Sequence, residues 1–163
     1  MSAVVSFPHG NSTTEVKVAE ARRAIDDGAQ EIDMVSNIGA LKSGDDDLFA
    51  ADVEGLSVLC QREGVVLKVI LECCYLDDGE KVRGALLAER AGADFVKTST
   101  GFGSGGATRE DVALLRRTVS GRVHVKAAGG IGTLEKALEM LDAGADRLGT
   151  SSGAKIMESL GSG

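Results

Sequence analysis

Two lysines stand at matching places in two short apolar stretches, Lys97 in DFVKTS and Lys126 in VHVKAA. A lysine becomes a Schiff-base nucleophile when burial or a neighbouring cation lowers its pKa. We expect the two stretches to form adjacent parallel strands about 4.8 Å apart, so that the two ammonium groups repel each other. The pair therefore predicts a nucleophilic lysine at position 97. The alternative is a lysine that reaches from a strand end into solvent.

Two further charged residues could assist such a lysine. Asp33 lies in EIDMV and is a candidate for proton transfer beside an imine, or else an ordinary salt-bridge partner. Lys68 lies in VLKVILE and shares a strand face with Ile70 and Glu72. Lys68 could therefore pair with Asp33 or simply with Glu72.

Two glycine-rich stretches, AAGGIGT and LGTSSGAK, suggest an anion site. In barrels of βα units, the loops after the last two strands commonly hold a phosphate group through backbone N–H groups. Ordinary turn chemistry is the alternative reading of these glycines. The expected phosphate-binding residues are Gly129, Gly130, Gly149, Ser151 and Ser152.

The other reactive side chains carry blander predictions. We expect His9 to cap a turn and His124 to be a satisfied core residue. Cys60, Cys73 and Cys74 are expected to pack as small apolar side chains. No group of histidines and acidic residues has the spacing of metal ligands, so the sequence predicts neither a metal nor a cofactor.

The elements that position these residues follow one repeated layout. In DDGAQEIDMV, RAGADFVKTS and DAGADRLGTS a helical segment ends at a glycine, and an apolar strand begins two or three residues later. This layout is typical of βα units around a parallel sheet. Polar residues at nearly every strand end favour a barrel over an open sheet. Six strands are expected, over 3–7, 31–35, 66–72, 94–99, 123–127 and 146–150, in one domain spanning 1–163.

Helical periodicity fills the segments between these strands. The first helix is expected to begin with a capping box of Ser12 and Glu15, with Val16 on its apolar stripe. Thr108 and Asp111 form the corresponding box of a later helix. Two more helices are expected within 47–63 and near 154–160.

Composition limits the possible partners. A net charge of −7 argues against a nucleic-acid-binding surface. The sequence shows no apolar run long enough to cross a membrane and no recognisable signal peptide. Three cysteines form no disulfide framework, which predicts a cytoplasmic protein with reduced thiols.

The chain resembles the deoxyribose-phosphate aldolases, a family of class I aldolases, through EIDMVSNIGALKSGD, AGADFVKTSTGFGSGGAT, VKAAGGI and AGADRLGTSSG. The resemblance implies a TIM barrel that cleaves 2-deoxy-D-ribose 5-phosphate to acetaldehyde and D-glyceraldehyde 3-phosphate, and catalyses the reverse addition. It implies that Lys97 forms the imine, that Lys126 lowers its pKa, and that Asp33 belongs to the proton relay. The glycines and serines after the last two strands would hold the phosphate. The substrate pocket is expected to include Thr100, Gly101 and Lys68.

The sequence departs from the family in two respects. The resemblance starts at the family's third strand, so we expect six of eight βα units and two unpaired edge strands. These edges predict a homo-oligomer that covers them. Gly132 stands where the family usually has arginine, and this difference is expected to weaken either the phosphate site or a helix contact. The alternative function is a catalytically impaired partial barrel that acts as a fragment or an assembly module.

Overall fold

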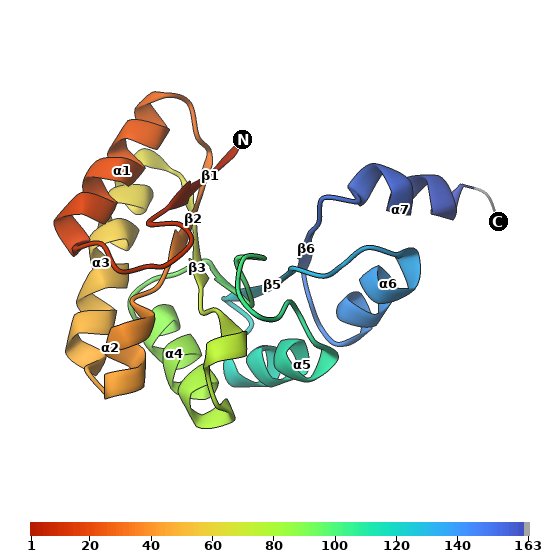
Figure 1. Ribbon diagram of the computed structural model, residues 1–163. Coiled ribbons are helices and arrows are strands. Elements are labelled where there is room, and N and C mark those ends of the chain that lie inside the picture. The colour runs from red at the N-terminus through yellow and green to blue at the C-terminus, as the bar shows by residue number, and fades with distance from the viewer. Residues whose placement is uncertain (162–163) are drawn as a thin grey trace.

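The structure, a computed structural model, describes residues 1–161. Strands and helices alternate along most of the chain, and the helices lie around the outside of the strands (Figure 1). The elements are β1 (Ser2–Val5), α1 (Thr14–Asp26), β2 (Glu31–Val35), α2 (Ile38–Ser43), α3 (Asp46–Glu63), β3 (Val66–Ile70), the 3₁₀ turn η1 (Cys73–Tyr75), α4 (Asp78–Arg90), β4 (Phe95–Lys97), α5 (Arg109–Thr118), β5 (His124–Ala128), α6 (Leu134–Asp142), β6 (Arg147–Gly149) and α7 (Gly153–Leu160).

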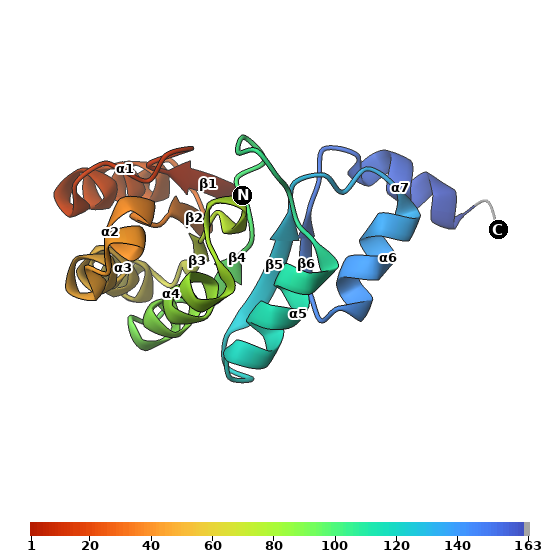
Figure 2. The same ribbon diagram turned by 60° about the horizontal axis from the view of Figure 1, so that its bottom comes forward.

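The six strands form one parallel sheet in chain order, β1-β2-β3-β4-β5-β6. Each strand pairs in parallel with the next, and the sheet curves so that the helices lie outside it (Figure 2). Within residues 1–161, β1 and β6 are edge strands with one partner each. The predicted fold class, a TIM-barrel-type arrangement of six βα units, is confirmed.

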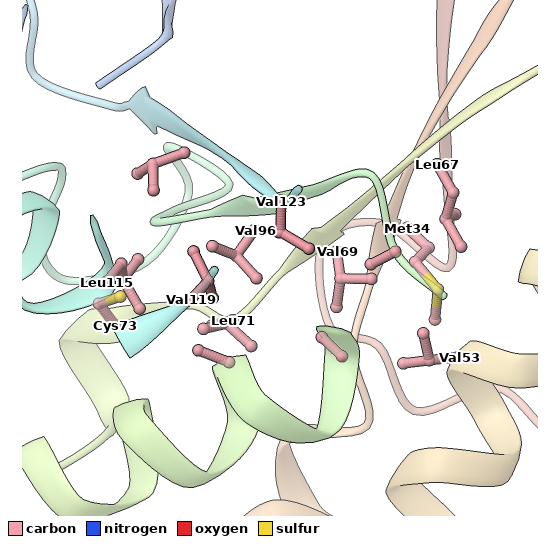
Figure 3. Packing of buried hydrophobic residues seen from close by; sticks show 14 of the residues in the cluster. Met34, Val53, Leu67, Val69, Leu71, Cys73, Val96, Leu115, Val119 and Val123 are labelled. Carbon is pink, nitrogen blue, oxygen red and sulfur yellow. The ribbon is translucent and has the colours of Figure 1, made fainter. Parts of the chain in front are cut away.

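Alternate strand residues divide cleanly between the two faces of the sheet, as the pleat requires. Met34, Val69 and Val96 point outward and pack against the helices, forming the apolar core (Figure 3). Asp33 pairs in register with Lys68 on the opposite, inner face. The sequence pattern of charged residues among apolar ones therefore reflects an apolar outer face and a charged inner face.

The start of α1 differs from the prediction. Its N-cap is Thr13, which makes no side-chain capping bond, so the expected capping box of Ser12 and Glu15 is wrong. Val16 is 53% exposed, whereas Lys17 is completely buried. The helix turns the face with Lys17 inward because the Lys17 ammonium donates to the Val35 carbonyl at 2.9 Å and forms an ion pair with the buried Asp52 on α3.

Other local predictions had mixed outcomes. Thr108 caps α5 by accepting from the Asp111 N–H at 3.1 Å, so this half of the expected capping box is confirmed. The Asp111 carboxylate instead pairs with Lys81, 2.7 Å away, and the structure shows no return bond to the Thr108 N–H. Helix α2 was not expected, and most strands are shorter than predicted. Gly153 begins α7, one residue before the expected start.

The minor histidine and cysteine predictions were partly correct. The prediction of a core position for His124 is wrong, because its side chain is 49% exposed on the uncovered inner face. His9 is exposed, and its capping role stays a prediction. Cys60 and Cys73 are buried, and burial raises the pKa of the Cys60 thiol to about 11. Cys74 is only partly buried.

No helix among the described residues is both long and apolar enough to span a membrane. Residues 162–163, which belong to the predicted single domain, lie outside the described part of the chain.

Candidate functional site

Three lysines converge on one carboxylate at the inner face of the sheet. The Nζ atoms of Lys97 and Lys126 lie 2.9 and 2.7 Å from the same oxygen, Oδ2 of Asp33. Lys68 Nζ lies 2.8 Å from the other oxygen, Oδ1. We call these four residues the lysine cluster. Of the two partners that the sequence left open for Lys68, the structure brings it to Asp33.

Strand register explains why these side chains meet. Lys97 on β4 pairs directly with Lys126 on β5, and Asp33 on β2 pairs directly with Lys68 on β3. Residues in register on parallel strands project to the same face, so all four side chains enter the same interior. The curvature of the sheet then brings Asp33 within reach of β4 and β5, which are not its neighbours.

Burial and charge oppose each other in the lysine cluster. Burial by itself raises the pKa of Asp33, but the Lys97 charge and the hydrogen bonds from the three lysines hold it well below the usual range. Burial is also the main cause of a lowered pKa at Lys126, where the hydrogen bond to Asp33 opposes the shift and the Lys97 charge adds to it. Asp33 is therefore an anion that cannot neutralise all its neighbours.

A second layer lies beneath the cluster, toward the N-terminal ends of the strands. Glu31 Oε2 lies 2.6 Å from Lys68 Nζ, and Arg147 Nη1 lies 2.7 and 2.8 Å from the two Glu31 oxygens. The Arg147 guanidinium also stacks over the Phe95 ring at 4.8 Å. We call Glu31, Phe95 and Arg147 the floor of the site. Sequence reasoning did not single out either floor charge, although Glu31 stands two residues before Asp33 and thus on the same strand face.

Glu72, which the sequence offered only as a possible partner of Lys68, instead bonds the loop beside the pocket. It follows β3 with a left-handed backbone (φ 59°), and its carboxylate is buried. It accepts from the Thr100 N–H at 3.1 Å and also bonds the Thr100 hydroxyl. A non-glycine residue in this conformation signals a local constraint. Here the constraint fixes the start of the loop that follows β4.

A pocket of about 610 Å³ opens above Lys97 at the C-terminal ends of the strands. Thr100 and Gly101 line it, as expected, and the exposed ring of Phe102 stands beside them. Asp33, Lys68 and Lys126 lie outside this lining, so Lys97 is the cluster member that faces the pocket. The five residues predicted to bind phosphate all contribute to the wall: Gly129, Gly130, Gly149, Ser151 and Ser152.

Close backbone contact shapes the wall after β5. Gly129 and Gly130 both have positive φ angles, 87° and 74°, which favour glycine. A Cβ atom on Gly106 would lie 2.3 Å from the Gly129 carbonyl oxygen, so the two loops can approach only without side chains. The Ala107 N–H donates to that same oxygen at 3.0 Å. The glycines therefore serve the packing of loop on loop and leave backbone N–H groups near the pocket.

The wall continues at the start of α7, after the neighbouring strand β6. Ser152 is the N-cap residue, and its N–H donates to Thr150 Oγ1 at 2.9 Å. The first N–H groups of a helix have no partners within that helix, and its positive end favours anions. A Cβ on Gly132 would meet nothing within 4 Å, so this position leaves open space in the wall. Lys97 is the one charged side chain among the described lining residues.

This arrangement can support amine chemistry on a carbonyl compound that carries an anionic end. Lys97 is largely buried at the base of the pocket, where it can meet a carbonyl carbon. Basic and acidic groups that can accept or return a proton lie beside it, and neutral donors line the far wall. Among the described residues, no group of three or more histidine, cysteine or acidic side chains is arranged to hold a metal ion.

Known proteins similar to this chain are named as deoxyribose-phosphate aldolases. Over 158 residues the chain is 56% identical to the deoxyribose-phosphate aldolases of Thermococcus gammatolerans and Thermococcus kodakarensis, covering 97% of itself and 70% of each relative. A tetrameric deoxyribose phosphate aldolase structure from Aeropyrum pernix superposes with a TM-score of 0.90 at 37% identity, over 99% of this chain and 68% of that one. The crystal structure of a Coccidioides immitis protein, described as a putative deoxyribose-phosphate aldolase, superposes with a TM-score of 0.93 at 40% identity, over 98% of this chain and 63% of that one.

The family match covers almost the whole sequence. The sequence model of the DeoC/LacD family aldolases matches residues 1–159, a span that includes the lysine cluster, the floor and the pocket wall. The chain belongs to the DeoC/LacD family of aldolases.

Proposed function

We propose that this chain is a class I aldolase that cleaves 2-deoxy-D-ribose 5-phosphate to acetaldehyde and D-glyceraldehyde 3-phosphate, and that also catalyses the reverse addition. The observation that carries the proposal is the approach of Lys97 and Lys126 to one oxygen of Asp33, beneath a pocket with glycine- and hydroxyl-rich walls. The choice of 2-deoxy-D-ribose 5-phosphate as substrate comes from the relatives, which are named deoxyribose-phosphate aldolases.

The first step is imine formation at Lys97. Its neutral amine attacks the aldehyde carbon C1 of the open-chain sugar, and loss of water gives a protonated imine. Lys126 lies at the same Asp33 oxygen as Lys97, so it is placed to accept and return the protons of this step. Repulsion between the two ammonium groups favours the state in which one of them is neutral.

The second step breaks the C2–C3 bond. The C3 hydroxyl gives its proton to the relay of Asp33 and Lys126, and the electrons of the C2–C3 bond move into the imine to form an enamine with a C1=C2 double bond. Glyceraldehyde 3-phosphate leaves as an aldehyde, and the relay later returns the proton to C2. Protonation of C2 and hydrolysis of the resulting imine then release acetaldehyde and restore Lys97. The positively charged nitrogen acts as the electron sink, which is the reason for covalent catalysis here.

The far wall of the pocket is the proposed phosphate site. Gly129 and Gly130 contribute backbone N–H groups near β5, while Ser151 and Ser152 stand before α7. Such amides and a helix N-terminus bind phosphate without a cationic side chain. Gly132 stands where the family is expected to have an arginine, and the space beside it is open. A phosphate contact without this arginine would be weaker.

Trapping of the imine tests this proposal. The protein is incubated with acetaldehyde and sodium borohydride, digested, and mapped by mass spectrometry. We expect much more ethylation on Lys97 than on the exposed Lys42, which measures the background of non-specific reductive alkylation. The matched variant Lys97→Met should lose the adduct. Folded protein without an adduct at Lys97 would refute the imine mechanism and favour an inactive partial barrel that serves as an assembly module.

We also propose that copies of this chain associate through the uncovered edges of the sheet. Edge strands present unpaired N–H and C=O groups, and β1 and β6 each have such an edge. The tetrameric relative from Aeropyrum pernix makes self-association plausible for a member of the family. Light scattering of purified protein should give a mass of at least two chains, and a monodisperse monomer would contradict this.

A further inference from the structure

The floor contains an ion pair that joins two distant strands. Arg147 is on the edge strand β6 and Glu31 is on β2, so the pair joins strands that are separated by three others in the sheet. The labels of β2 and β6 in Figure 1 show how far apart these strands lie in the curved sheet. Phe95, on the intervening strand β4, lies beneath the guanidinium. The proposed reaction does not use this pair, because neither side chain lines the pocket.

Charge counting shows what the pair does. The lysine cluster places three ammonium groups around a single carboxylate, Asp33. Glu31 supplies a second negative charge through its 2.6 Å contact with Lys68, but Arg147 occupies the same carboxylate. The completely buried Lys68 ammonium contacts both Asp33 in the lysine cluster and Glu31 in the floor. Lys68 therefore connects the charges of the floor to those of the cluster.

The same contacts influence the ionisation of the floor itself. Hydrogen bonds from Lys68 and then Arg147 lower the pKa of Glu31 to about 2, although burial opposes the shift. Glu31 thus remains an anion at every pH at which the site could work. A fixed anion paired with a fixed cation provides two opposite charges of constant size beneath the cluster.

We propose that Glu31 and Arg147 are positioning residues that form a charge bridge under the lysine cluster, with Glu31 stabilising and Arg147 destabilising the ammonium form of Lys97. The proposal rests on the proposed imine function only for its biological purpose, since the electrostatic effect itself needs no substrate. The proposal predicts opposite shifts in the pH at which Lys97 loses its proton. Loss of the Glu31 charge should lower this pH, and loss of the Arg147 charge should raise it.

Other charged groups also face this region and must stay constant in the test. Asp33, Lys68 and Lys126 contact or surround Lys97 directly. Beyond the C-terminal end of β3, the buried Glu72 bonds Thr100. At the N-terminal end of β5, beside the floor, the exposed His124 lies 3.4 Å from Asp146 and its ring centroid lies 5.0 Å from that of Phe95. The floor variants replace none of these side chains, although Glu31→Gln removes one charged partner of Lys68.

Competitive acetylation gives a direct readout. The protein is treated with trace acetic anhydride over a pH series, and acetylation of Lys97 is measured against exposed lysines by mass spectrometry. We expect Glu31→Gln to move the pH midpoint of Lys97 down and Arg147→Gln to move it up. Each shift should be about half a pH unit for a charge two strand spacings away, roughly 10 Å, in a partly hydrated site. The double variant should return close to the parent midpoint.

A surface ion pair provides the matched control. Arg22 and Glu63 lie 2.8 Å apart on α1 and α3, and their exposure resembles that of Arg147 and Glu31. Arg22→Gln and Glu63→Gln make the same changes of net charge outside the barrel, where solvent screens them. Neither control should move the Lys97 midpoint measurably.

A purely structural clamp gives a different pattern. If the pair only held β2 and β6 together, both single variants would loosen the same contact and move the midpoint in the same direction or leave it unchanged. Either result overturns the proposal. If Arg147→Gln does not fold, Arg147→Lys keeps the charge without the planar fork, and we expect the parent midpoint; a shift in this variant also contradicts the proposal.

Acetylation separates this inference from the proposed reaction. Opposite shifts without an ethyl adduct at Lys97 would refute the imine function and leave the charge bridge supported. An ethyl adduct without opposite shifts would do the reverse.

Discussion

Replacement of Lys126 by alanine tests how the lysine pair works. Lys97 and Lys126 approach the same Asp33 oxygen at 2.9 and 2.7 Å, so their nitrogens can be no farther apart than the sum of these distances. At roughly 5 Å and an effective dielectric constant of about 40, their repulsion is worth ~1.7 kcal/mol, which corresponds to about one pH unit. The Lys97 charge contributes to the lowered pKa of Lys126, and such coupling is mutual.

Lys126→Ala should therefore raise the pH midpoint of ethyl trapping at Lys97 by about one unit and reduce trapping at pH 7 roughly tenfold. Loss of Lys126 also leaves Asp33 more available to hold Lys97 as an ammonium ion, which acts in the same direction. The assay is borohydride trapping with acetaldehyde across pH, followed by peptide mapping. Lys126→Arg is the matched control, because it keeps the charge and should keep the midpoint within a few tenths of a unit.

The result that refutes this reasoning is an unchanged midpoint in Lys126→Ala. Trapping that falls equally at every pH would assign Lys126 to proton transfer alone, without electrostatic influence on Lys97. The arginine variant separates these cases further, since it keeps the repulsion but is a poor proton donor near neutral pH.

Three other outcomes are expected. Asp33→Asn leaves three buried ammonium groups beside a neutral amide. The free energy of unfolding, measured with urea at pH 7, should therefore fall by about 3–5 kcal/mol, and an unchanged urea midpoint would contradict this. The pKa of Glu31 falls from 4.5 to about 2 in the folded protein. The Glu31 carboxylate therefore stabilises the fold above about pH 4.5, and this contribution disappears as the pH falls toward 2. Glu31→Gln should flatten the curve of unfolding free energy against pH between these two values. Gly106→Ala places Cβ 2.3 Å from the Gly129 carbonyl oxygen and should cost about 2 kcal/mol in urea unfolding, whereas Gly121→Ala, in open space, should cost much less.

Several parts of the site could be predicted because they depend on local pattern. The period of two along a strand placed Lys97 and Lys126 on the same face, and the register confirms that they are direct partners. The Asp33–Lys68 contact was among the predicted alternatives for the same reason. Glycines after β5 and serines before α7 marked a pocket wall, because turns and helix starts have strong composition signals. The roles assigned to these residues stay predictions.

Other parts could not be predicted, since they depend on contacts across the curved sheet. Arg147 and Glu31 meet between β6 and β2, and no sequence period links those positions. Glu72 bonds Thr100 only because the chain after β3 adopts a left-handed turn. His124 was placed in the core by an argument that assumed a closed interior, whereas the inner face near β5 is open to solvent.

The sequence alone determined the repeated βα layout, the face of each strand that carries charge, and the presence of a lysine pair on neighbouring strands. These properties depend on residues close together in the chain or on the period of a strand, and both can be read from the order of residues. The tertiary structure decided that three lysines share one carboxylate, and that a fixed ion pair lies beneath them. The curvature of the sheet decides which side chains meet across it, because curvature brings together strands that are not neighbours.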